Sequence, residues 1–133
     1  MICAPEGQAD LAENLGVSLA RPLAPTWNGT RYQCVYRYAT GGSTLSVDEL
    51  PDLASARSEV RRLARTLGRV PPALKIGDEA FAVKSHSVIV RKDRKVLIVD
   101  VTTLPAAFGK PPLDPLTAAE TIAITIMECW TGE

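Results

Sequence analysis

The chain is poor in the residues from which most active sites and metal sites are built. In 133 positions it has one histidine, three cysteines and only 5% aromatic residues. The cysteines (Cys3, Cys34 and Cys129) form no Cys-x-x-Cys pair, and a single histidine cannot complete a zinc-binding set. We therefore expect no metal and no cofactor, and no motif assigns catalytic residues.

Net charge and long apolar runs are absent as well. Fifteen basic and fifteen acidic residues cancel, which argues against a nucleic-acid partner, because sequence-independent binding of DNA or RNA neutralises several phosphates. No run of about 20 apolar residues could span a bilayer. Met1 and Ile2 lead directly into Cys3 without a signal peptide. We expect either a cytosolic protein or a mature portion that restarts at a methionine.

What is present is the pattern of one domain covering residues 1–133. A chain of this length, with 46% apolar residues, can bury about two-thirds of its unfolded surface. Helical periodicity and end signals such as Gly16, Gly68 and Asp114 predict three helices. These helices are expected at 4–15, 51–67 and 115–130.

Alternation of apolar and polar residues predicts the strands. They are expected at 30–38, 43–47, 80–84, 87–92 and 95–102. Gly41–Gly42 and Asp93–Arg94 provide turns, and the proline-containing stretches 17–29 and 70–72 are interpreted as connections. The prediction is an α+β fold with a single antiparallel sheet of about five strands and helices packed on it, in the order α-β-β-α-β-β-β-α.

The cysteines leave two interpretations open. One is a disulfide bond plus a free thiol, and the other is three buried thiols. A Cys3–Cys34 bond would tie the first helix to the sheet and contribute about 3–4 kcal/mol on the chain-entropy estimate. Cys129 is typical of a small core residue, and a reactive Cys129 would need a basic partner, for which His86 is the only histidine.

Two groups of side chains are candidates for binding. The first comprises aromatic residues that could line a wall between the sheet and the loop 104–113: Trp27, Tyr36, Tyr38 and Phe108. The second comprises cations that could contact a phosphate or lipid headgroup: Arg57, Arg61, Arg65, Arg91, Lys92 and Arg94. The plainer interpretations are a strand row that belongs to the core, and a solvated helix face with a charged hairpin tip.

Several short segments together resemble a known group of proteins. They are Cys3 followed by LAENLG, YQCVY at 32–36, IGDEAF at 76–81, VIVRKD at 88–93 and VLIVDV at 96–101. The combination resembles small secreted lipoprotein domains of unknown function from actinobacteria. It is also similar to extracellular sensor-like domains of actinobacterial serine/threonine kinases, which have a PsbP-like α/β sandwich fold. The resemblance implies a Cys3–Cys34 bridge, an extracytoplasmic location and no catalytic residues.

The leading hypothesis is a non-enzymatic extracytoplasmic domain that binds a small ligand or a protein partner at the cell envelope. In that case a membrane would be reached only through a tether, and no lipobox or tether is present in this sequence. The alternative is a cytosolic protein-interaction or chaperone-like domain with reduced cysteines. A thiol-dependent enzyme that uses Cys129 is the third hypothesis.

Overall fold

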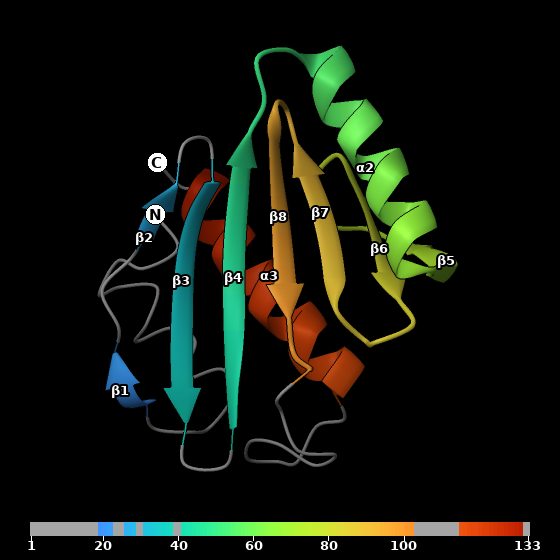
Figure 1. The fold of residues 1–133 in the computed structure, drawn as a ribbon. Coiled ribbons are helices and arrows are strands. Elements are labelled where there is room, and N and C mark those ends of the chain that lie inside the picture. Colours follow the sequence, from blue (N-terminus) through green and yellow to red (C-terminus); the bar gives the residue numbers. More distant parts are fainter. Residues whose placement is uncertain (1–18, 23–25, 29–30, 39–40, 103–114, 132–133) are drawn as a thin grey trace.

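One antiparallel sheet with a helix on each face forms the body of the protein (Figure 1). The structure, a computed structural model, describes residues 19–22, 26–28, 31–38, 41–102 and 115–131. The strands are β1 (Leu19–Pro22), β2 (Thr26–Asn28), β3 (Arg31–Tyr38), β4 (Gly41–Glu49), β5 (Arg69–Leu74), β6 (Glu79–Val83), β7 (Val88–Lys92) and β8 (Lys95–Asp100). The described helices are α2 (Leu53–Leu67) and α3 (Pro115–Thr131).

The strands pair in the order β1-β3-β4-β8-β7-β6-β5, and β2 also pairs with β3. The prediction of about five strands, in the order α-β-β-α-β-β-β-α, is wrong, because β1, β2 and β5 were interpreted as connections. The five expected strands are all present, although Gly41 and Gly42 pair within β4 rather than forming the turn. The predicted helix at 4–15 lies outside the described residues.

Strand β5 shows why the prediction failed. It contains Pro71 and Pro72, and its pairing with β6 shifts register between Val70 and Leu74. Proline has no N–H to donate to a ladder, so it breaks a central strand but is tolerated at a sheet edge or a bulge. Because β5 is the last strand of the sheet, its free side needs no donors.

Helix α2 ends where its sequence indicates, but it begins at Leu53, two residues after the expected start. Asp52 is the N-cap, where its carboxylate accepts the Ser55 N–H at 2.7 Å, so it stands one residue before the helix rather than in the first turn. This bond lowers the pKa of Asp52. Gly68 ends the helix in the left-handed region, with φ at 79°, and its N–H donates to the Ala64 carbonyl.

The core has two parts, one on each face of the sheet. Side chains of α2, including Val60 and Leu63, pack on Phe81, Ile89 and Val96. On the opposite face, α3 packs on a larger cluster that includes Cys34, Leu45 and Leu97. Strand β8 alternates between these two clusters, so it is covered on both sides, as its continuous apolar run predicts.

Candidate functional site

Helix α2 covers only one half of its face of the sheet (Figure 1). The register places the α2-side residues in rows, and Gln33, Ser46, Ile98 and Ile89 form one such row across β3, β4, β8 and β7. The row is apolar under α2 and polar on β3 and β4. No helix of the described residues lies over the polar half, which we call the open face.

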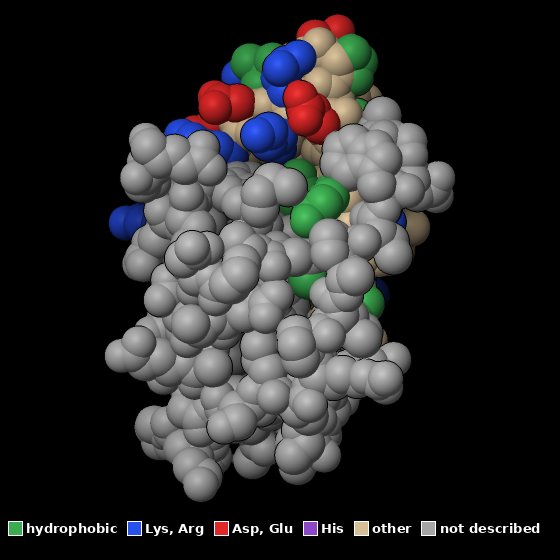
Figure 2. Space-filling view, turned by 90° about the vertical axis from the view of Figure 1, so that its left-hand side faces the viewer, with side chains coloured by type: hydrophobic (Ala, Val, Ile, Leu, Met, Phe, Trp, Pro, Cys, Tyr) green, Lys and Arg blue, Asp and Glu red, His purple; other side chains and the backbone are tan. Residues whose placement is uncertain are grey.

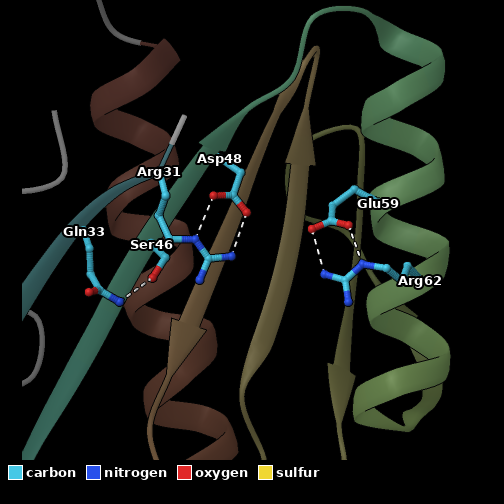
Figure 3. Close-up of polar contacts among 6 residues, drawn as sticks. All are labelled: Arg31, Gln33, Ser46, Asp48, Glu59 and Arg62. Atoms are coloured by element: carbon cyan, nitrogen blue, oxygen red, sulfur yellow. Dashed lines mark hydrogen bonds and ion pairs between the residues drawn. The ribbon is translucent and has the colours of Figure 1, made fainter. Parts of the chain in front are cut away.

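Side chains of the open face are joined across the strands (Figure 3). The Arg31 guanidinium donates two hydrogen bonds to the Asp48 carboxylate, Nε to Oδ1 and Nη2 to Oδ2, each at 2.8 Å. Next to it, Gln33 Nε2 donates to Ser46 Oγ at 3.1 Å. Asp48 is buried while the Arg31 side chain is 42% exposed. The bonds hold these polar groups in one arrangement.

A second bidentate ion pair faces the open face from α2. Glu59 accepts from Arg62 Nε at 2.7 Å and Nη2 at 2.9 Å, and both side chains point from α2 toward β4 (Figure 3). The hydrogen bond to Asp48 raises the pKa of Arg31. The negative charge of Glu59 on α2 raises this pKa further. In the same way, the bond to Glu59 raises the pKa of Arg62.

Charges of both signs are mixed on this side of the molecule. In the view that faces the left-hand side of Figure 1, basic and acidic side chains lie next to one another in the described part (Figure 2). Adjacent opposite charges neutralise each other at a distance, especially in salt. In the described part of this view, the neighbouring charges therefore give little long-range attraction for an anion or a cation.

The predicted cations of the β7–β8 hairpin tip are all held by carboxylates. Arg91 is 8% exposed and bonded to Glu79, and its Nη1 also lies 3.5 Å from Asp78 Oδ2. Lys92 lies 3.5 Å from Asp78 Oδ1, and Arg94 lies 3.8 Å from Glu49. These bonds fix the hairpin to the Gly77–Glu79 segment and leave little positive charge for an external phosphate.

Asp78 provides a pH-dependent bond at this tip. The Asp93 N–H donates to Asp78 Oδ2 at 2.8 Å, which lowers the pKa of Asp78 together with the neighbouring Lys92 and Arg91. Because this pKa is lower in the folded than in the unfolded chain, the stabilisation is present above about pH 4 and is lost as pH falls through the folded value.

We expect Asp78→Asn to lower the free energy of unfolding at pH 7 by less than about 1 kcal/mol, since the site is partly exposed. The difference from the parent protein should shrink as pH falls from about 4 through the lowered pKa of folded Asp78, because the carboxylate then becomes protonated. Urea unfolding at pH 7 and pH 3 measures this difference. An equal difference at both pH values would contradict the assignment.

The other predicted cations lie apart from the hairpin tip. Arg57, Arg61 and Arg65 are exposed along α2, and within the described part of the chain none of them forms an ion pair or hydrogen bond. The structure therefore separates the two groups that the sequence analysis combined.

The aromatic candidates lie outside what the structure describes. Phe108 is outside the described residues. Trp27 lies in β2 and Tyr36 and Tyr38 in β3, but only their backbones are described. A ligand-binding wall formed by these residues stays a prediction.

One observation bears on the cysteine prediction. Cys34 is 1% exposed within the core on the α3 side, and it is disulfide-bonded. Cys3 lies outside the described residues, and Cys129 belongs to α3 with its side chain undescribed. The pairing of Cys34 with Cys3 therefore stays a prediction.

His86 has a structural place in the β6–β7 turn. Its φ is 71°, in the left-handed region, and its N–H donates to the Val83 carbonyl at 2.9 Å. A residue of this conformation closes a three-residue hairpin loop. The geometry explains His86 without a ligand or a catalytic role.

Sequence reasoning missed the open face. Neither Arg31 nor Asp48 is among the residues that the sequence analysis proposes for binding. The available signal was the polar alternation of 31 and 33 together with that of 46 and 48. Only the hairpin register, which pairs Arg31 with Asp48 and Gln33 with Ser46, brings the two alternations together.

Comparisons with known proteins identify no similar protein. No protein-family model, curated protein or solved structure matches the chain. Within the described residues, no group of three or more metal-ligating side chains occurs, and neither helix has the length and apolar content to cross a membrane.

Proposed function

We propose that the protein is a non-enzymatic, extracytoplasmic binding domain that holds a protein partner at the cell envelope through its open face. One observation carries the proposal: α2 covers the apolar half of its sheet face, and on the polar half the Arg31 side chain, held by the buried Asp48 carboxylate, is 42% exposed. A surface that is already ordered loses less conformational entropy when a partner binds.

The chemistry of the open face favours a polar protein surface over an apolar small molecule. Arg31 is half exposed and keeps donor capacity beyond its two bonds to Asp48. Thr44 and Ile98 are partly exposed on the same face, where Ile98 pairs with Ser46 and Thr44 lies two residues from Ser46 along β4. Mixed contacts of this kind, with arginine and scattered apolar groups, are typical of transient protein interfaces.

The location outside the cytoplasm is supported by Cys34. A buried disulfide-bonded cysteine is typical of oxidising compartments, because cytosolic reductants keep thiols reduced. The resemblance to secreted lipoprotein and sensor-like domains points the same way.

Retention of a partner on immobilised protein tests the binding role. The parent protein, Thr44→Arg on the open face and Ser58→Arg on the outer face of α2 would each be exposed to a solubilised envelope fraction. We expect a protein that the parent and Ser58→Arg retain equally and that Thr44→Arg retains at least about tenfold less, as a misplaced charge costs more than about 1.4 kcal/mol at an interface. Equal retention by all three, or none, would refute the open face as the binding site.

Intact mass after alkylation under denaturing, non-reducing conditions tests the compartment. One alkylated cysteine in protein taken from its own cell would support the proposal, and peptide mapping would show whether Cys3 or Cys129 pairs with Cys34. Three alkylated cysteines would refute the extracytoplasmic part and favour the cytosolic interaction domain.

A further inference from the structure

A row of cations continues along α2 and past its end. Arg57, Arg61, Arg65 and Arg69 follow one another at a spacing of four residues, which keeps them on adjacent positions of one helical stripe up to the helix end. Lys84 joins them, because its N–H donates to the Gly68 carbonyl at 3.0 Å and its side chain lies against Gly68. We call these five residues the basic ridge.

The ridge keeps its positive charge, unlike the other cations nearby. Arg31, Arg62, Arg91, Lys92 and Arg94 each lie in an ion pair. Among the described residues, no carboxylate pairs with any member of the ridge. A chain with no net charge therefore has one side with concentrated positive charge.

Two further features lie at the end of the ridge. Leu67 is one of three large apolar side chains that are exposed in the described part of the chain, at 38%, and it directly precedes Gly68. Arg69 lies over the Phe81 ring, 4.8 Å from its centroid, so its position is held while it stays exposed. An exposed apolar side chain together with basic residues is typical of protein surfaces that lie on a membrane interface.

We propose that the basic ridge docks on an anionic lipid surface, with arginines at the phosphates and Leu67 at the level of the headgroups. Guanidinium groups bind phosphate oxygens with paired hydrogen bonds. From Arg57 to Arg65 the helix rises about 12 Å, so the charges form a line that suits a surface rather than one enclosed phosphate. No member of the ridge takes part in the hydrogen bonds of the open face, and the proposal does not depend on the proposed protein partner.

Vesicle sedimentation tests the docking. The intact protein would be mixed with vesicles of phosphatidylcholine alone and with vesicles containing phosphatidylglycerol, at low and at physiological salt. We expect binding to the anionic vesicles only, and weaker binding at physiological salt because the attraction is screened. Equal binding to both vesicle types would overturn the proposal.

A pair of matched variants locates the contact. Arg61→Gln with Arg65→Gln removes two charges from the ridge, while Arg62→Gln with Arg94→Gln removes two exposed charges elsewhere. We expect the ridge variant to lower the partition coefficient at least about tenfold, and the control to lower it less than about threefold. Equal losses would show a response to net charge alone and would overturn the ridge as the contact. Circular dichroism would confirm that both variants are folded.

Binding of a soluble polyanion distinguishes a lipid surface from free phosphate as the ligand of the ridge. If inorganic polyphosphate binds the protein and the anionic vesicles do not, the ridge recognises phosphate in solution and the membrane proposal is wrong. If Leu67→Asn weakens binding to anionic vesicles severalfold but leaves polyphosphate binding unchanged, the apolar contact with lipid is supported.

Discussion

Gly77→Ala is expected to lower the free energy of unfolding by about 3 kcal/mol or more, which is a large part of the stability of a small domain. A Cβ at this position would lie 2.7 Å from Val90 Cγ1 and 2.8 Å from the Arg91 carbonyl oxygen. In addition, φ is 61°, a conformation that alanine rarely adopts. The steric contact and the backbone conformation both act against the substitution.

Relief of this contact would require strand β7 to move. Arg91 O accepts the Asp78 N–H at 2.8 Å, and β7 is paired on both sides, with β6 and with β8. A shift of β7 would therefore break ladder bonds or open the buried cluster around Val90. This is why a single methyl group should have so large an effect.

Gly68→Ala is the matched control for Gly77→Ala. Gly68 also has a positive φ, at 79°, but an added Cβ would meet only the flexible Lys84 side chain, at 2.9 Å from Cδ. We expect a cost of about 1 kcal/mol from the backbone conformation alone. Urea unfolding followed by circular dichroism measures both variants. Equal costs would mean that the close approach to β7 does not exist.

The central elements of the fold could be predicted because their signals are local. Helix α2 has an apolar stripe with Asp52 before it and Gly68 after it, and its observed end is the expected one. The β7–β8 hairpin follows from two apolar runs separated by Asp93 and Arg94. In these elements, propensity, pattern and turn residues all favour the same structure.

The edges of the sheet could not be predicted, since short edge strands depend on a partner that lies elsewhere in the sequence. Strands β1 and β2 have four and three residues, too few to show alternation. Strand β5 contains two prolines, which normally indicate a break. Pairing with β3 or β6 supplies the hydrogen bonds that make these segments strands.

For the charged residues of the candidate sites, too, the sequence alone could not predict which side chains are exposed and which are paired. The sequence identifies Arg61 and Arg91 equally as basic residues, yet one is exposed on α2 and the other is buried between carboxylates. The difference arises from the β6–β7 register, which places Glu79 opposite Arg91. Composition and spacing reveal how many charges are present, and only the register determines which of them are neutralised.

Glu79→Ala is expected to lower the free energy of unfolding by about 2 kcal/mol, because it leaves a buried guanidinium without its main counter-charge. Arg91 is 8% exposed and is bonded to Glu79 through Nε. The remaining partners are weaker: the Asp93 carbonyl accepts from Nη1 at 3.1 Å, and Asp78 Oδ2 lies 3.5 Å away. They reduce the loss below that of a fully unpaired buried charge.

Glu59→Ala provides the comparison for this prediction, since it also removes a carboxylate that is hydrogen-bonded to an arginine. Arg62 is 52% exposed, so water replaces the lost carboxylate, and alanine favours the helix; we expect a change close to zero. Urea unfolding of the two variants side by side gives the difference. If both variants lower the free energy of unfolding equally little, Arg91 is hydrated in solution. It would then belong with the exposed cations as a candidate for anion contact. If Glu79→Ala costs clearly more, Arg91 is a structural residue of the hairpin, and the exposed positive charge of the described chain is concentrated on the basic ridge.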